Sequence, residues 1–109
     1  MATETLKQDD TSPALDYTIL DDSNQVVDLT GATVVFYMQD EDGVTVVNGA
    51  SATITDAANG KVEYQWQAAD TDTAGIFKGE FVVTFPDGTI RTFPDPGWIM
   101  IVISGSVRG

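Results

Sequence analysis

The chain has 109 residues, 42% of them hydrophobic, which is enough for one domain with a single core. Seventeen acidic residues against five basic ones give a formal net charge of −12, so we expect neither nucleic acids nor anionic membranes as partners. Cysteine and histidine are both absent, which removes disulfides, thiolate chemistry and the commonest metal ligand.

The two ends of the chain differ in composition from the middle. Residues 1–13 are polar and acidic with one leucine, so we expect a flexible N-terminal arm. Residues 14–103 are expected to form the folded domain, and residues 104–109 a short flexible tail. The first residues lack the basic start and apolar stretch of a signal peptide, which predicts a protein made and left in the cytoplasm.

The middle of the chain alternates apolar and polar side chains with the period of two that β-strands show. This pattern predicts extended segments over 15–19, 26–29, 33–38, 44–47, 52–55, 61–67, 77–85, 89–93 and 98–103, with one helical turn within 67–73. Asx-Gly dipeptides at 42–43, 48–49, 59–60 and 87–88 predict tight turns. Short strands between turns predict an all-β antiparallel sandwich of seven to eight strands.

Several strands are apolar on both faces, and the second face is informative. If Ile99, Ile101 and Ile103 pack in the core, the apolar residues of opposite parity face outward. These candidate contact residues are Val35, Tyr37, Val82, Trp98, Met100 and Val102. On neighbouring strands they would form a patch of the kind that marks protein contacts. The alternative is that Trp98 covers the open end of the sandwich and the others pair across strands.

Catalytic hypotheses find little support in the residue types. Without histidine, a serine or threonine nucleophile has only the five lysines and arginines as a base, and no phosphate-binding or dinucleotide motif occurs. Glu63 and Glu80 lie at outward strand positions and could form the carboxylate pair of a glycoside hydrolase. Their placement beside Lys61 and Lys78 is more typical of solvated strand charges. We therefore predict no enzyme, no catalytic residue and no cofactor.

Three acidic loops concentrate the oxygen ligands that calcium prefers, at residues 21–24, 40–42 and 70–72. None matches the spacing of the twelve-residue calcium loop. Aspartates that form turns or cap helices explain the same clusters, and we expect Asp70 and Asp72 to cap the turn at the corner before residue 77. No metal ligand is predicted, and calcium remains the alternative.

Two longer segments resemble a known family. Residues 27–34 read VDLTGATV, and residues 62–85 contain YQW, DTDTAG and a phenylalanine-rich strand. Together with the hairpin at 87–94, they resemble, in the same order, an immunoglobulin-like module of bacteriophages. That module occurs at the N-terminus of baseplate upper proteins and in other tail or virion components. The resemblance covers roughly residues 15–103 and implies an immunoglobulin-like β-sandwich.

The corner before the phenylalanine-rich strand is also similar to that of true immunoglobulin domains. Ala74 and Gly75 keep the spacing, Phe77 stands where those domains have the corner tyrosine, and Gly79 stands where they have the disulfide cysteine. The resemblance therefore implies that the hydrogen bond of the corner hydroxyl is missing.

The family resemblance implies a non-enzymatic structural component of a bacteriophage virion, made in the host cytoplasm. We expect a baseplate, tail or fibre accessory subunit that contacts other virion proteins, as a homo-oligomer or within a larger assembly. No coiled-coil or receptor-binding part follows the module in this sequence, which favours a small accessory subunit. The alternatives are a capsid decoration protein and a carbohydrate-binding host-adhesion module, in which Tyr37 or Trp98 would stack on sugar rings.

Overall fold

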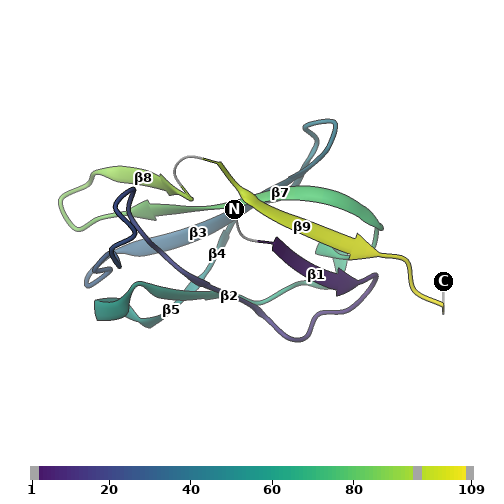
Figure 1. The fold of residues 1–109 in the computed structure, drawn as a ribbon, viewed down its shortest axis with the longest axis horizontal. Coiled ribbons are helices and arrows are strands. Elements are labelled where there is room, and N and C mark those ends of the chain that lie inside the picture. Colours follow the sequence, from purple (N-terminus) through teal and green to yellow (C-terminus); the bar gives the residue numbers. More distant parts are fainter. Residues whose placement is uncertain (1–2, 95–96, 108–109) are drawn as a thin grey trace.

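Two β-sheets pack face to face in the computed structural model, which describes residues 3–94 and 97–107 (Figure 1). The larger sheet has the order β1-β9-β7-β3-β4, and β8 pairs with the second half of β7. Its strands are Thr3–Lys7 (β1), Thr33–Asp40 (β3), Thr45–Ser51 (β4), Gly75–Thr84 (β7), Ile90–Phe93 (β8) and Ile99–Ser104 (β9). The smaller sheet has the order β2-β6-β5, with strands Leu15–Thr18 (β2), Thr53–Asp56 (β5) and Lys61–Tyr64 (β6). The predicted all-β sandwich is therefore confirmed.

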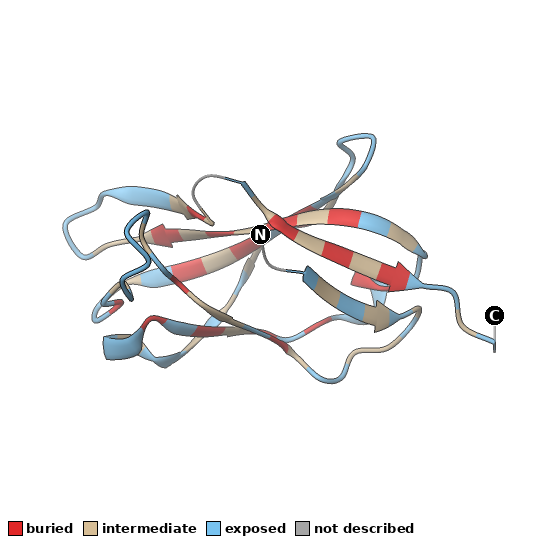
Figure 2. Cartoon of the chain, viewed as in Figure 1, coloured by how far each residue is buried: buried red, intermediate tan, exposed pale blue. Residues whose placement is uncertain are grey.

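The strict alternation within the strands determines which side chains lie between the sheets. Ile99, Ile101 and Ile103 are buried, as predicted, and Figure 2 shows buried and partly buried residues alternating along β9 and β7. Phe36 lies at the centre of an aromatic cluster, with ring centroids 4.6 Å from Tyr64 and 5.0 Å from Phe81. Aromatic pairs at these separations stabilise a core beyond the area they bury.

The N-terminal segment, predicted to be a flexible arm over residues 1–13, contains a strand of the large sheet. Strand β1 pairs in parallel with β9, from Thr3 opposite Met100 to Lys7 opposite Ser104, and the two run side by side in Figure 1. The Leu6 side chain packs against the core, and the backbone N–H of Gln8 donates to Ser104 O at 2.8 Å. The edge of β9 supplies the hydrogen-bonding partner that this polar segment lacks by itself. Residues 1–2 and 108–109 lie outside the described residues.

Two of the four predicted tight turns join neighbouring strands of the large sheet. The turn at 42–43 connects β3 to β4, and the turn at 87–88 connects β7 to β8. The pair at 48–49 does not form a turn; it lies inside β4, beside a shift in register against β3. Gly49 has a φ of +69°, and the Tyr37 hydroxyl would lie 2.9 Å from a Cβ there, so only glycine fits this bulge.

Extended chain at 26–29 is not a strand in the structure; it contributes one isolated bridge, Leu20 opposite Val26, and the buried side chain of Leu29. The sequence pattern there reflects a core contact made by a loop. The short 3₁₀ turn η1 (Ala57–Asn59) ends at Gly60, whose φ of +67° directs the chain back into β6.

The corner where the chain crosses from the small sheet to the large one is built on Asp70. The 3₁₀ turn η2 (Ala68–Asp70) is closed by the Asp70 carboxylate, which accepts the backbone N–H of Gln67 at 2.8 Å and the hydroxyl of Tyr64. The predicted capping role of Asp70 is confirmed. Phe77 has no hydroxyl to donate, as expected, and Tyr64 of β6 supplies a hydroxyl bond at the corner instead. Asp72 is exposed, and its carboxylate accepts the Thr73 hydroxyl rather than capping the turn.

Candidate interaction surface

The outer face of the large sheet carries all six candidate contact residues. Val35 and Tyr37 lie on β3, Val82 on β7, and Met100 and Val102 on β9, while Trp98 directly precedes β9. Their strand neighbours in the sequence are buried, so these side chains point away from the small sheet. Tyr37 is 37% exposed, and the other five are partly buried.

The register divides the six residues into two groups on this face. Val35 lies opposite Val82 in one group, whereas Met100 and Val102 lie opposite Lys78 and Ile76 in the other. Lys78 and Glu80, on β7, separate the groups, and Glu80 lies opposite Tyr37. The sequence pattern predicts that these two charges are solvated strand residues. Their outward parity, shared with Val82, was the signal that they belong to the same surface.

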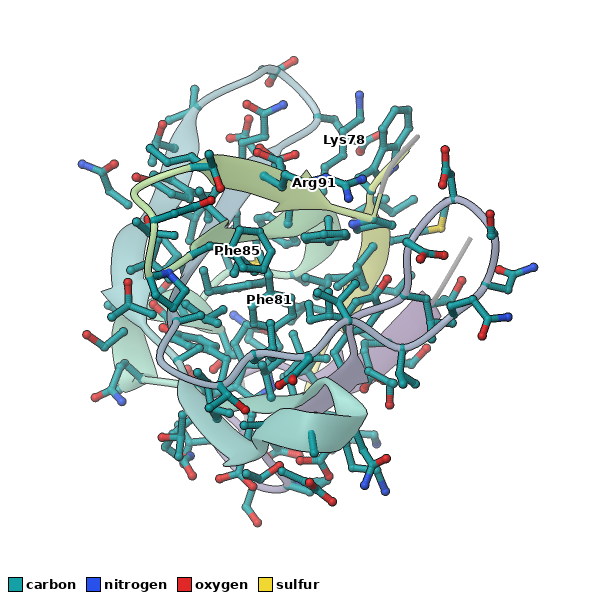
Figure 3. All side chains as sticks on the ribbon, turned by 90° about the vertical axis from the view of Figure 1, so that its left-hand side faces the viewer. Lys78, Phe81, Phe85 and Arg91 are labelled. Carbon is teal, nitrogen blue, oxygen red and sulfur yellow. The ribbon has the colours of Figure 1, made fainter. Side chains whose placement is uncertain are left out.

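A hollow of about 200 Å³ lies between the two groups, lined in part by Tyr37, Lys78, Glu80 and Trp98. The Nζ of Lys78 lies 4.3 Å from the centroid of the Trp98 ring, within the range of a cation–π contact. Figure 3 shows Lys78 on the outer side of the sheet, while Phe81 of the same strand points into the space between the sheets. The Lys78 ammonium group and the Trp98 ring therefore contact each other in the lining of the hollow.

Acidic residues are scarce on this surface although the chain has a net charge of −12. Among the outward residues of the described strands of the large sheet, the charged ones are Lys7, Lys78 and Glu80. Several other acids lie in turns, where their carboxylates accept backbone N–H groups. Asp21 and Asp40 each accept two backbone N–H groups, and the hydroxyl and N–H of Thr89 lower the pKa of Asp87. The outer face is therefore apolar and locally free of excess negative charge.

Neither of the two chemical alternatives, a calcium site and a carboxylate pair, has a matching arrangement among the described residues. Within residues 3–94 and 97–107, no group of three or more acidic side chains could hold a metal ion, and the loops at 21–24 and 40–42 act as turns. Glu63 lies on the outer face of the small sheet and Glu80 on that of the large sheet. They face away from each other, so they cannot form a carboxylate pair across one substrate.

No helix in the described part of the chain is long and apolar enough to span a membrane.

A second, larger hollow of about 480 Å³ opens at the side of the sandwich where β1 approaches β2 and β6. Glu4, Asp16 and Glu63 line it together with Lys61. Burial, and then the charge of Asp16, raise the pKa of Glu4 above its ordinary value. The hollow therefore collects negative charge at the edge of the two sheets.

The architecture places the chain among small two-sheet β-sandwich proteins. Among solved structures, it is similar to the crystal structure of CopC from Methylosinus trichosporium OB3b, with a TM-score of 0.55. That match covers 96% of this chain and 86% of the other at 14% sequence identity, so the likeness concerns the fold alone. No curated protein matches the chain.

The family to which this chain belongs is shown by a match to a family model. The family model described as the BppU N-terminal domain, the N-terminal domain of the baseplate upper protein, matches residues 3–93, and the chain belongs to this family. The match begins in β1, so the family's pattern includes the N-terminal strand. Membership implies a structural protein of the phage baseplate, located in the virion and in contact with other virion proteins.

Proposed function

We propose that the protein is a non-enzymatic accessory subunit of the baseplate or tail, which is held in the particle through the outer face of its large sheet. The observation that carries this proposal is the composition of that face. On an acidic protein, it presents Trp98, Tyr37 and Met100, and Glu80 is the one acidic outward strand residue of this face in the described part of the chain. Aromatic residues and methionine are enriched, and acidic residues depleted, at the centres of protein interfaces.

The test compares two substitutions that add the same charge at different places. Trp98→Asp places a carboxylate on the outer face, whereas Val44→Asp places one in the β3–β4 hairpin, where Val44 is 60% exposed. Particles would be assembled with each variant, purified, and assayed for the protein by quantitative mass spectrometry. Circular dichroism would establish that both variants fold.

We expect Trp98→Asp to reduce incorporation about tenfold or more, because a buried unpaired carboxylate costs at least 1–3 kcal/mol. Val44→Asp should incorporate at the wild-type level. A folded Trp98→Asp protein that enters particles normally would refute the proposal. Comparison of isolated tails with isolated heads would separate a tail subunit from a capsid decoration protein.

A sugar-binding function has one observation in its favour, the hollow between Tyr37 and Trp98. Lys78 lies over the Trp98 ring that would stack on a sugar, which counts against it. A glycan array probed with and without calcium tests this second function. Specific binding that Trp98→Asp removes would support it, and an array without signal would reject it.

A further inference from the structure

We infer that the outer face of the large sheet binds a second copy of this chain, face to face about a twofold axis that passes over Gly79. The inference rests on the proposed function, because it names the partner of that same surface. The axis lies between the two copies and runs across their strands. Rotation about this axis reverses the direction of every strand and leaves the order of the strands unchanged. Each strand therefore lies over the same strand of the other copy: β3 over β3, β7 over β7 and β9 over β9.

The charges of β7 are self-complementary about this axis. Lys78 and Glu80 are the outward residues on either side of Gly79, whose position points inward toward Phe36 and Ile101. Reversal along the strand sets Lys78 of each copy opposite Glu80 of the other. One contact therefore yields two equivalent ion pairs, as an isologous interface requires.

The flanking strands repeat the same arrangement. Gln39 and Met100 lie opposite Lys78 on β3 and β9, and Tyr37 lies opposite Glu80. Ile99 lies opposite Gly79, so Trp98, the residue before it, lies in the same row across the strands as Glu80 and Tyr37. The axis sets Trp98 of one copy against Met100 of the other, a favourable thioether–aromatic contact. It likewise sets the Tyr37 hydroxyl against the Gln39 amide, so each strand offers a complementary pair.

The distribution of charge also favours a second copy on this face. The outward strand residues of the large sheet, in the part of the chain that the structure describes, carry two lysines and one glutamate. An arrangement through the turns would instead bring the acids of two copies together, each with a net charge of −12. Sheets packed face to face lie about 10 Å apart, and the hollow beside Lys78 leaves space for side chains of the opposing copy.

Charge reversal tests the inference directly. The variants are Lys78→Glu, Glu80→Lys and the double variant with both changes, examined by sedimentation velocity at about 10–100 μM. Lys61→Glu, on the small sheet, is the matched control for a change of lysine to glutamate. We expect the wild type and Lys61→Glu to dimerise, and each single reversal to raise the dissociation constant about tenfold or more.

Two further samples distinguish specific pairing from a general loss of structure. An equimolar mixture of Lys78→Glu and Glu80→Lys should form a heterodimer, since the two like-charged contacts of each homodimer become two opposite-charged pairs in the heterodimer. The double variant should dimerise like the wild type. A monomeric wild type, a single reversal that dimerises normally, or a mixture that stays monomeric would each overturn the inference. A monomeric wild type whose Trp98→Asp variant is still lost from particles would overturn this inference alone and leave the proposed function standing.

Discussion

The hydroxyl of Tyr64 donates a hydrogen bond to the buried carboxylate of Asp70, which joins β6 of the small sheet to the turn that leads into β7 of the large sheet. Tyr64 is 2% exposed and Asp70 8%. The same carboxylate oxygen accepts the backbone N–H of Gln67. A buried carboxylate needs such partners, because an unpaired one costs far more than a hydrogen bond contributes.

Removal of this hydroxyl should destabilise the fold. We expect Tyr64→Phe to lower the free energy of unfolding by about 1.5–3 kcal/mol, since the Asp70 carboxylate loses a donor in a buried place. Urea unfolding followed by tryptophan fluorescence measures the change. Tyr17→Phe is the matched control, because the Tyr17 ring stacks on Phe81 while its hydroxyl has no hydrogen bond among the described residues, and it should change stability by less than about 0.5 kcal/mol. Equal effects of the two substitutions would contradict the role of the corner bond.

The stability of the protein should fall in alkaline solution through the same residue. Burial, followed by the hydrogen bond to Asp70, raises the pKa of Tyr64 above its ordinary value of 10.0. Above pH 10.0 the unfolded chain loses this proton while the folded chain retains it, so unfolding becomes more favourable as the pH rises. The contribution of Tyr64 is about 1.4 kcal/mol per pH unit.

Urea titrations between about pH 9 and pH 11.5 would measure this slope, and absorbance of the phenolate would follow ionisation. The Tyr64→Phe protein should show a shallower decline than the wild type over the same range. If the two proteins lose stability in parallel, the residues responsible for alkaline unfolding lie elsewhere.

Gly79 is expected to tolerate no side chain. A Cβ there would lie 2.7 Å from Cδ1 of Ile101 and 2.9 Å from Cζ of Phe36, which is itself packed between other rings. Gly79→Ala should therefore lower the midpoint of urea unfolding, by the equivalent of about 1–3 kcal/mol. Gly105→Ala is the control, because no atom lies within 4 Å of its added Cβ. Wild-type stability for Gly79→Ala would mean that the core relaxes freely at this point.

The N-terminal strand should contribute to stability although its sequence is polar. Deletion of residues 1–7 removes the pairing of β1 with β9 and the contact of Leu6 with the core. We expect a loss on the order of 2–4 kcal/mol and a greater tendency to aggregate, because the edge of β9 becomes free. Deletion of residues 105–109, which follow β9, should have little effect by comparison. Thermal unfolding followed by light scattering would measure both properties, and similar curves for the two deletions would argue against a structural role for β1.

The sequence alone determined those features that depend on local chemistry. Alternation along residues 77–85 and 98–103 fixed which side chains of β7 and β9 enter the core, because a strand turns successive residues to opposite faces. The Asp-Gly pairs at 42–43 and 87–88 predicted two hairpins, since such residues accept tight turns at little cost. The outward parity of the six candidate contact residues follows from the same alternation.

The tertiary structure decided what depends on residues far apart in the chain. Strand β1 has no apolar pattern of its own, and its place follows from the free edge of β9, where Leu6 meets Ser104 across 98 positions. The donor at the corner is Tyr64 rather than residue 77, because the η2 turn brings the Asp70 carboxylate back beside the end of β6, a local fold that strand alternation does not predict. Gly49 forms a bulge beside Tyr37 rather than a turn, because β4 continues its pairing with β3 on both sides of this residue. The alternation of apolar and polar residues along a strand determines the face of the sheet on which a side chain lies. The register between strands determines which side chain lies beside it.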